Sequence, residues 1–373
     1  MAQNVNTQRV SEGGVSIWLD DLSRDRLNSG SLEKLIQEKT VVGVTTNPAI
    51  FQKAIQGKGA YDEQIAELVK SNPNVSVDEV VTELTTTDVR NATDIFRDVY
   101  EASDFVDGRV SIEVDPRLAY DGATTTVQAE QLWEKLDRPN GMIKIPATVE
   151  SLPAITATLA KGISVNVTMI FSKERYLQVI DAYISGIEQA KNNGHDLKKI
   201  ASVASFFVSR VDTAIDKQLD EIGTPEALEL RGKSALANAR VAFAAYEEAF
   251  SNDPRWSELE KLGAKKQRPL WASTGVKNPN YPGTLYVDGL VGPNVVNTMP
   301  ESTLDAVAQG PVEGKDVLSG KGAESQAILD AVEAQGISVS GVLQKLEDDG
   351  LAAFVDSWTA LLADIQSNID SKK

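Results

Sequence analysis

The chain has 373 residues, 42% hydrophobic and 24% charged, which is the balance of an ordinary globular protein and a length that fits one large α/β domain or two domains. Lys and Arg total 37 against 54 Asp and Glu, so the formal charge is −17. Such an acidic surface repels nucleic acids and anionic membranes, and no apolar run reaches the roughly 20 residues that would span a bilayer.

Eight short apolar stretches follow one another along the chain, and helical patterns lie between most of them. The stretches are residues 15–19, 41–45, 109–114, 141–145, 164–170, 200–208, 268–273 and 284–290. After Ser172, a plausible helix N-cap, apolar residues recur at steps of three and four up to Ile187. Alternation of strands and helices indicates a parallel sheet, and eight such units predict a closed (β/α)8 barrel, the TIM barrel of the α/β class.

Two regions exceed a minimal barrel. Residues 210–265 form an Ala- and Glu-rich helical stretch between the sixth and seventh predicted strands, and residues 302–373 are predicted to be helices after the eighth. No long Pro/Gly/Ser linker, repeat or low-complexity tract interrupts the chain. We therefore expect a single barrel domain over residues 1–373, with a flexible N-terminal segment over residues 1–13.

The strands share a polarity pattern. Side chains alternate between the two faces of a strand, so Ser111 and Glu113 oppose Val110 and Ile112. If the aliphatic faces pack on the outer helices, the polar faces point into the barrel. The polar residues at or near the C-terminal ends of their strands are Asp20, Asn47, Glu113, Lys144, Asn166 and Thr168. In barrel enzymes this end forms the catalytic face.

Each of these residues has an ordinary explanation when it is considered alone. A strand lysine is most often an edge residue or one whose ammonium reaches solvent, and an Asn before Pro is most often part of a turn. The shared parity and the shared end of the strands favour one inward-facing site instead. The sixth strand follows the pattern less well, because Ser205 faces the same way as Val203 and Phe207.

The residue types limit the chemistry. The chain has no cysteine, which excludes disulfides, thiolate catalysis and cysteine-ligated metals, and its one histidine, His195, lies in a polar loop sequence. Burial disfavours the charged form of a lysine, and a neutral amine can form a Schiff base with a ketone. Glu113 and Asp20 are the carboxylates available for proton transfer, but they could equally hold Lys144 in a structural ion pair.

Five sequence blocks resemble the signature blocks of the transaldolase family, in family order. They are "GVTTNPAIF" (43–51), "SIEVDPRLAYD" (111–121), "GMIKIPAT" (141–148), "VNVTMIFS" (165–172) and "SFFVSRVD" (205–212), and "VDGLVGPNVVNTMPEST" (287–303) resembles the family's last strand and loop. The resemblance implies a Schiff-base enzyme on a (β/α)8 barrel. Such an enzyme moves a dihydroxyacetone unit between sugar phosphates in the non-oxidative pentose phosphate pathway, without a metal or cofactor.

The resemblance also implies roles for particular residues. Lys144 matches the Schiff-base lysine, and Glu113 matches an acid–base carboxylate that works through a water held in part by Thr168. Asp20 matches the aspartate that handles substrate hydroxyls and the proton of cleavage. Asn47 and Asn166 match asparagines that bind the dihydroxyacetone hydroxyls.

A further group of residues matches the family's contacts to the substrate and its phosphate. Arg210 matches the phosphate arginine, Ser205 a serine near the substrate, and Ser273 a further phosphate or substrate contact. Many relatives carry a second arginine shortly after that serine. The nearest cation here is Lys277, which could equally be a solvated loop residue.

Two alternative functions stay open on the sequence. One is a Schiff-base fructose-6-phosphate-type aldolase, which releases dihydroxyacetone instead of transferring it. The other is an inactive barrel that acts as a binding protein. We expect sugar phosphates as partners, no nucleic acid or membrane, and a monomer or homodimer. The N-terminal residues lack the basic and apolar regions of a signal peptide, so a cytoplasmic location is expected.

Overall fold

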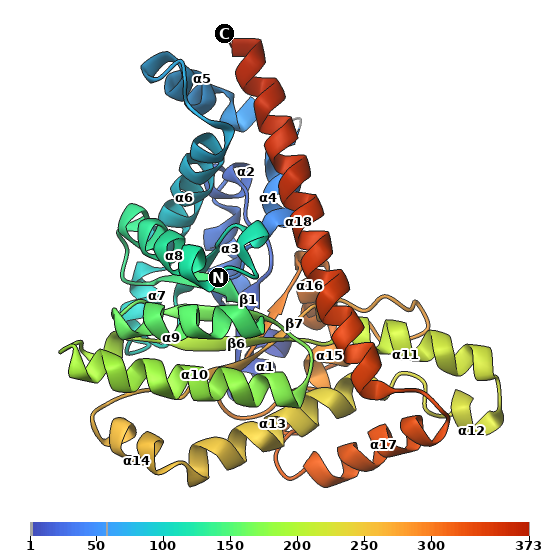
Figure 1. Ribbon diagram of the computed structural model, residues 1–373. Helices are drawn as coiled ribbons and strands as arrows, with labels where there is room; N and C mark the ends of the chain where they lie inside the picture. Colours follow the sequence, from blue (N-terminus) through green and yellow to red (C-terminus); the bar gives the residue numbers. More distant parts are fainter. Residues whose placement is uncertain (1–2, 57–58, 373) are drawn as a thin grey trace.

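The computed structural model describes residues 3–56 and 59–372. Its parallel strands close into one barrel in chain order, with β1 paired to β8. The strands are β1 (Val15–Leu19), β2 (Val41–Val44), β3 (Arg109–Glu113), β4 (Gly141–Pro146), β5 (Val165–Ile170), β6 (Ser202–Phe207), β7 (Arg268–Ala272) and β8 (Val295–Met299). This is the predicted (β/α)8 barrel, with helices around it (Figure 1).

The helices connect the strands and extend the barrel. The α-helices are α1 (Val5–Glu12), α2 (Arg24–Asn28), α3 (Ser31–Lys39), α4 (Pro48–Ile55), α5 (Asp62–Ser71), α6 (Val77–Ile95), α7 (Arg97–Ala102), α8 (Gly122–Leu136), α9 (Leu152–Ala160), α10 (Lys173–Asn192), α11 (Ser209–Ile222), α12 (Pro225–Leu228), α13 (Ser234–Asn252), α14 (Pro254–Lys261), α15 (Leu285–Asp288), α16 (Glu301–Gln309), α17 (Gly322–Ala334) and α18 (Val339–Lys372). Short 3-10 turns are η1 (Gly59–Tyr61), η2 (Pro116–Leu118), η3 (Val149–Ser151) and η4 (Leu197–Lys199). The helices expected between the sixth and seventh strands, and after the eighth, are present.

The position predicted for the eighth strand is wrong. Residues 284–290 hold the short helix α15, and the strand lies later, at Val295–Met299. The strand was missed because Asn297 and Thr298 interrupt its apolar run. Both are buried inside the fold, where Asn297 donates to the Tyr286 carbonyl at 3.0 Å and accepts from Thr274 at 2.9 Å. Because these polar side chains form hydrogen bonds inside the protein, they can be buried in a strand whose sequence is typical of a loop.

The flexible segment expected at residues 1–13 does not fit residues 5–12, which form α1. Asn4 caps this helix by accepting from the backbone N–H groups of Asn6 and Thr7, and Val10 is fully buried. The cap and one buried apolar side chain are enough to order a polar sequence against the barrel. Residues 1–2 lie outside the described residues.

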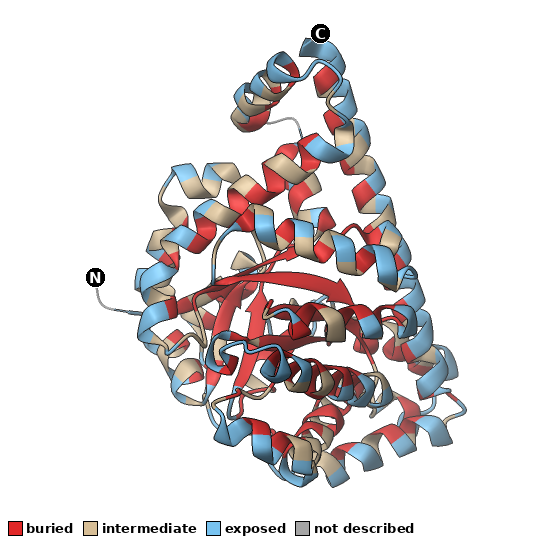
Figure 2. Cartoon of the chain, turned by 60° about the vertical axis from the view of Figure 1, so that its left-hand side comes forward, coloured by how far each residue is buried: buried red, intermediate tan, exposed pale blue. Residues whose placement is uncertain are grey.

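A long excursion between β2 and β3 is the feature of the architecture that the apolar stretches did not reveal. Helices α4 to α7 all belong to this connection. Together with the end of α18, α5 and part of α6 form a projection above the barrel (Figures 1 and 2). Asn368 on α18 donates to Asp62 on α5 at 3.0 Å, which links the C-terminal helix to the connection between β2 and β3.

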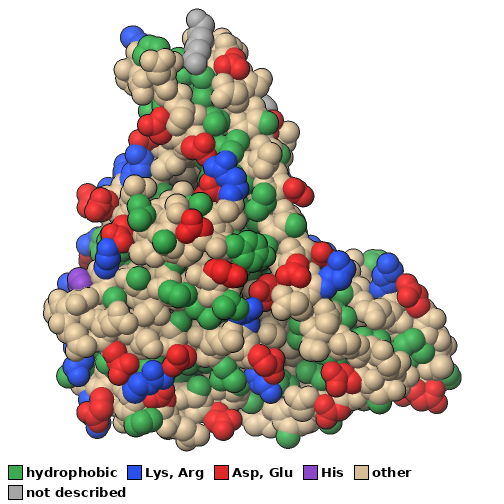
Figure 3. All heavy atoms as spheres, in the orientation of Figure 1, with side chains coloured by type: hydrophobic (Ala, Val, Ile, Leu, Met, Phe, Trp, Pro, Cys, Tyr) green, Lys and Arg blue, Asp and Glu red, His purple; other side chains and the backbone are tan. Residues whose placement is uncertain are grey.

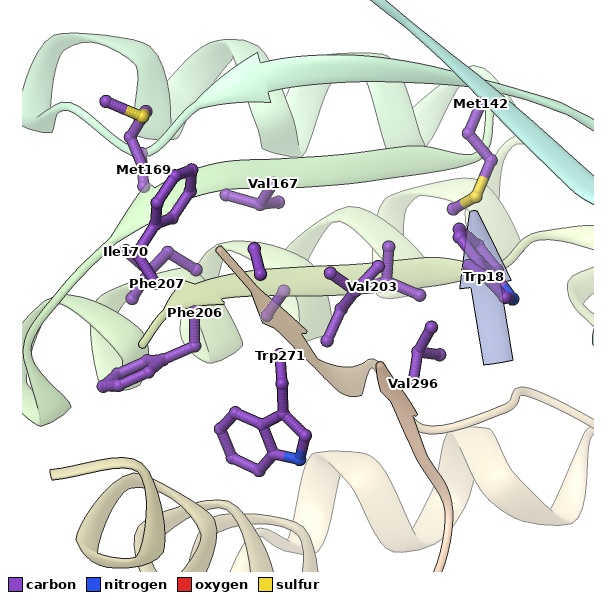
Figure 4. Close-up of a cluster of buried hydrophobic side chains, with 14 of the residues drawn as sticks. Trp18, Met142, Val167, Met169, Ile170, Val203, Phe206, Phe207, Trp271 and Val296 are labelled. Atoms are coloured by element: carbon purple, nitrogen blue, oxygen red, sulfur yellow. The ribbon is translucent and has the colours of Figure 1, made fainter. Parts of the chain in front are cut away.

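The barrel is filled by side chains at one end and open at the other. Trp18, Met142, Val203 and Val296 gather from four strands (Figure 4). Nearby, the fully buried Arg109 donates to Ser164 Oγ at 3.1 Å. Ser164 and Arg109 precede or begin their strands, so these groups close the N-terminal end of the barrel. The C-terminal end is therefore where a cavity can form.

The surface matches the composition. Acidic and basic side chains are interspersed over the face shown in Figure 3. Among the described residues, no helix combines the length and the apolar character needed to cross a membrane.

Candidate active site

Strand register places three of the predicted site residues in one row. Glu113 on β3 pairs with Lys144 on β4, and Lys144 pairs with Asn166 on β5. The three side chains point into the barrel and are buried, with exposed fractions of 6% for Glu113, 4% for Lys144 and none for Asn166. The alternation predicted for these strands is confirmed. Neighbouring side chains of a strand point to opposite faces, so when the aliphatic side chains pack against the outer helices, the polar ones point into the barrel.

Lys144 makes two polar contacts across the barrel. Its Nζ donates to the carbonyl of Thr46 at 2.9 Å and lies 3.2 Å from Oε2 of Glu113. The ion pair that the sequence left as an alternative is thus present with Glu113. The pair also places a proton acceptor within reach of the amine, which is the geometry required for proton transfer between the two groups.

Glu113 has a strongly perturbed acidity. Burial raises the pKa of its carboxyl to about 7, against the opposing attraction of the Lys144 charge, and nearby Asp20 raises it further. A carboxyl with a pKa close to neutral is present in both protonation states near pH 7. It can therefore donate and accept protons in the same catalytic cycle.

Asp20 directly follows β1 and interacts electrostatically with Lys144. Its Oδ1 accepts from Thr45 Oγ1 at 2.7 Å, and Thr45 is 2.6 Å from Thr298 Oγ1 on β8. Burial raises the pKa of Asp20, while the charge of Lys144 and the Thr45 hydrogen bond oppose that rise. Two carboxyl groups with raised pKa values therefore flank one amine.

Asn166 and Thr168 occupy alternate positions on β5. Asn166 Oδ1 accepts from Ser205 Oγ at 2.7 Å, and its Nδ2 donates to Ser111 Oγ at 3.2 Å, which fixes the orientation of the amide. Thr168 Oγ1 is buried and has no hydrogen-bond partner among the described residues. A buried hydroxyl of this kind fits a site that holds a water or a substrate hydroxyl.

Asn47 is the N-cap of α4 as well as a site residue. Its Oδ1 accepts from the backbone N–H of Ile50 at 3.0 Å, and Pro48 starts the helix. The turn expected for an Asn-Pro pair is thus a helix start. The cap holds the side-chain amide at the wall of the cavity described next.

A cavity of about 260 Å³ opens at the C-terminal end of the barrel. Its lining residues are Asp20, Thr45, Asn47, Lys144, Thr168, Ser205, Phe207, Arg210, Ala272, Ser273, Gly275, Lys277, Thr298, Pro300 and Phe354. Of the predicted site residues, Glu113 and Asn166 do not line it; they contact the lining residues Lys144 and Ser205 instead. Larger surface hollows exist elsewhere, but this one is lined by eight of the ten predicted site residues.

The mouth of the cavity carries positive charge. Arg210 lies in the first turn of α11 with its guanidinium 5.4 Å from the centre of the Phe207 ring, and burial lowers its pKa. Neither Arg210 nor the exposed Lys277 has a carboxylate partner among the described residues. Ser273 joins them, with its Oγ 3.0 Å from that of Ser209. In a chain of charge −17, unpaired cations beside hydroxyl groups favour binding of an anion.

Among the lining residues that were not predicted as site residues are Thr45, Thr298 and Phe354. Thr45 lies within GVTTNPAIF, one of the blocks that resemble the family, so the sequence could have indicated it. Thr298 lies in the missed strand. Phe354 comes from α18, beyond all eight strands, and its surroundings in the sequence show only the apolar period of an amphipathic helix.

Two other charged or titratable residues, Arg117 and His195, lie outside the cavity. Arg117 bridges Asp115 and Asp78, both at 2.5 Å, and so braces the loop after β3. His195 is exposed. Within the described residues, no three His, Asp or Glu side chains are arranged to hold a metal ion.

Comparison with known families agrees with this geometry. The model of the transaldolase/fructose-6-phosphate aldolase family matches residues 17–365, which include every strand but the start of β1. The chain belongs to this family. The match covers α18 up to the level of Ile365, so the C-terminal helix is part of the family region rather than an appendage.

Relatives in the family cover the whole chain. A protein named transaldolase from Mycolicibacterium paratuberculosis is 58% identical over 370 residues, 99% of each chain. Proteins of the same name from Saccharopolyspora erythraea and Mycolicibacterium smegmatis are each 57% identical, over 100% of both chains. The chain is thus similar in its full length to several transaldolases.

Proposed function

We propose that this protein is a transaldolase, which transfers a dihydroxyacetone unit from a ketose phosphate to an aldose phosphate. The observation that carries the proposal is the buried Lys144 amine, 3.2 Å from Glu113, in a cavity that Arg210 and Lys277 also line; neither cation has a carboxylate partner in the described part of the chain. The family and the full-length relatives named transaldolase support the same reaction. The donor is sedoheptulose 7-phosphate or fructose 6-phosphate, and the acceptor glyceraldehyde 3-phosphate or erythrose 4-phosphate.

The first chemical step uses the amine. Lys144 Nζ gives up a proton to Glu113 and attacks the ketone carbon of the donor, and loss of water, with a proton returned by Glu113, gives a protonated imine. Glu113 acts as the acid and base for these proton transfers, through a water that Thr168 helps to hold. The raised pKa of Glu113 and the unpartnered Thr168 hydroxyl support these roles.

Carbon–carbon cleavage follows from the charge on the imine. Asp20 takes the proton of the donor's C4 hydroxyl, the C3–C4 bond breaks, and its electron pair moves through C3 and C2 to the imine nitrogen. An aldose phosphate leaves, and a dihydroxyacetone enamine stays on Lys144. The reverse sequence with a second aldehyde completes the transfer. Asn47 and Asn166 bind the hydroxyls of the transferred unit, and Ser205 orients Asn166.

The phosphate group of the sugar substrate is expected to bind at the cations that line the cavity. We assign Arg210 to the phosphate, with Ser273 and Lys277 as further contacts, because all three line the cavity. We further infer a cytoplasmic enzyme that acts as a monomer or homodimer. No nucleic acid or membrane is involved in this proposal.

Two measurements test the function. Sodium borohydride added with fructose 6-phosphate is expected to reduce the imine, which leaves the sugar-derived carbons attached to Lys144 through a stable amine. Peptide mapping would identify the modified residue. Product analysis with and without erythrose 4-phosphate separates the alternatives. Turnover that needs the acceptor supports a transaldolase, and rapid release of dihydroxyacetone without it supports an aldolase. Absence of any adduct on Lys144 would revive the inactive binding protein.

Arg210→Ala is expected to reduce kcat/KM for phosphorylated donors by about 10- to 100-fold, the scale of a lost charge-assisted hydrogen bond. The effect should fall mainly on KM, because in this proposal the guanidinium binds the phosphate and not the reacting atoms. Activity on unphosphorylated fructose should change little. Arg97→Ala, which removes a surface arginine paired with Glu101, is the control. Equal losses on both kinds of donor would remove Arg210 from the phosphate site.

A further inference from the structure

The C-terminal helix α18 crosses the catalytic mouth of the barrel. It has 34 residues, so it is roughly 50 Å long at about 1.5 Å per residue. It packs against α4, η2 and α11 and reaches β5, and the three helices directly follow β2, β3 and β6. All of these contacts lie at the C-terminal ends of strands, and the helix passes along that side of the molecule in Figure 1.

Phe354 is the residue that α18 contributes to the cavity. Its ring centre is 5.8 Å from Lys144 Nζ, and only 6% of the residue is exposed. Among the lining residues it is the only one supplied by α18. The ring therefore covers the amine from outside the barrel, in addition to Phe207 on β6, which lines the cavity from within the barrel wall.

The position of this ring is set by the close approach of the helix. A Cβ atom at Gly350, one turn before Phe354, would lie 2.3 Å from Cε of Met169 and 3.3 Å from Nη1 of Arg210. A larger residue at this position would push the ends of these two side chains aside, so Gly350 lets the helix lie near the end of β5 without displacing them. Met169 itself has a positive φ of 65°, at an irregularity in the pairing of β5 with β6. Leu351 and Trp358, on the same side of α18, are buried as well.

We propose that Phe354 determines the fate of the enamine by keeping water from Lys144. This inference rests on the proposed function. Release of dihydroxyacetone requires a proton to be added to the enamine carbon, and then water to add to the C=N carbon. The carbon–nitrogen bond breaks, which returns the ketone and the free amine. An apolar ring beside the nitrogen occupies space that this water needs, so an aldehyde acceptor reacts instead.

The test measures how the enamine partitions. Fructose 6-phosphate is supplied with erythrose 4-phosphate, and free dihydroxyacetone is measured against sedoheptulose 7-phosphate. Phe354→Ala is expected to raise the ratio of release to transfer by at least about tenfold, the lower end of the effect of one methylene group in an apolar pocket. Phe354→Leu, which keeps most of the buried apolar volume, should raise it less.

A matched control is available on the same helix. Trp358→Phe loosens the packing of α18 one turn away without altering the cavity wall, so its ratio should equal that of the wild type. A ratio unchanged in both Phe354 variants, or raised equally by Trp358→Phe, would overturn the proposal. Borohydride trapping separates this from a failure of the function. Adducts on Lys144 in the wild type with an unchanged ratio contradict only the role of Phe354, whereas absent adducts contradict the Schiff base itself.

Discussion

Lys144→Ala is expected to lower kcat by four or more orders of magnitude, on the scale of losing a covalent nucleophile. We expect no replacement for it, because Lys277, the other lysine that lines the cavity among the described residues, is exposed. Borohydride with fructose 6-phosphate should leave the variant unmodified. Lys161→Ala, which removes a half-exposed lysine paired with Glu130, is the control and should keep full activity. Substantial turnover in Lys144→Ala would contradict the Schiff-base mechanism.

The same variant has a predictable effect on stability. Glu113 already has a folded pKa of about 7, above its ordinary value of 4.5, because it is buried. A carboxyl whose pKa is raised on folding favours the folded state at low pH, and this contribution is lost as pH rises through the folded pKa. Without Lys144 the opposing attraction disappears, so that pKa rises further. The Tm difference between variant and wild type should therefore widen from pH 5 to pH 8.

Glu113→Gln is expected to lower kcat by about 10²- to 10⁴-fold, the range for loss of a general acid–base. The amide keeps the shape of the side chain but cannot exchange protons. Imine formation should persist at a reduced rate, so borohydride still modifies Lys144, but more slowly. Full activity in this variant would remove Glu113 from the proton relay.

The pH profile gives an independent measurement of the same role. In the wild type, activity that needs the Glu113 carboxylate should fall as pH drops through about 7, the pKa that burial produces. In Glu113→Gln, this fall of activity at acidic pH should be absent. Glu130→Gln, at a surface ion pair with Lys161, should retain it. If activity falls at acidic pH in Glu113→Gln as it does in the wild type, the group that titrates is not Glu113 but another, such as Asp20.

Much of the site was readable along the strands. Ser111 and Glu113, Met142 and Lys144, and Asn166 and Thr168 each fall on one face because the strand period is two, and the structure turns those faces inward. Strand parity needs no long-range information, since it follows from backbone geometry and the burial of aliphatic neighbours. The barrel class likewise followed from the alternation of strands and helices.

The eighth strand shows where local patterns fail. Its sequence, VVNTM, carries polar residues that are buried because Thr274, Tyr286 and Thr45 satisfy them. Those partners come from other parts of the chain, so the apolar count within the strand was too low to identify it. The TLYVDGL segment had the stronger apolar pattern, yet it forms a short helix and turn whose Tyr286 donates to Asp212.

The sequence by itself determined the barrel, the inward polar faces and the residue types available for Schiff-base chemistry, since these depend on periodicity and composition. Only the tertiary structure decided that Glu113 lies 3.2 Å from Lys144 in a buried setting that moves its pKa to about 7. It also decided that Phe354 covers the amine from a helix at the far end of the chain. Distances and burial between distant segments arise when the barrel closes, and no local pattern encodes them.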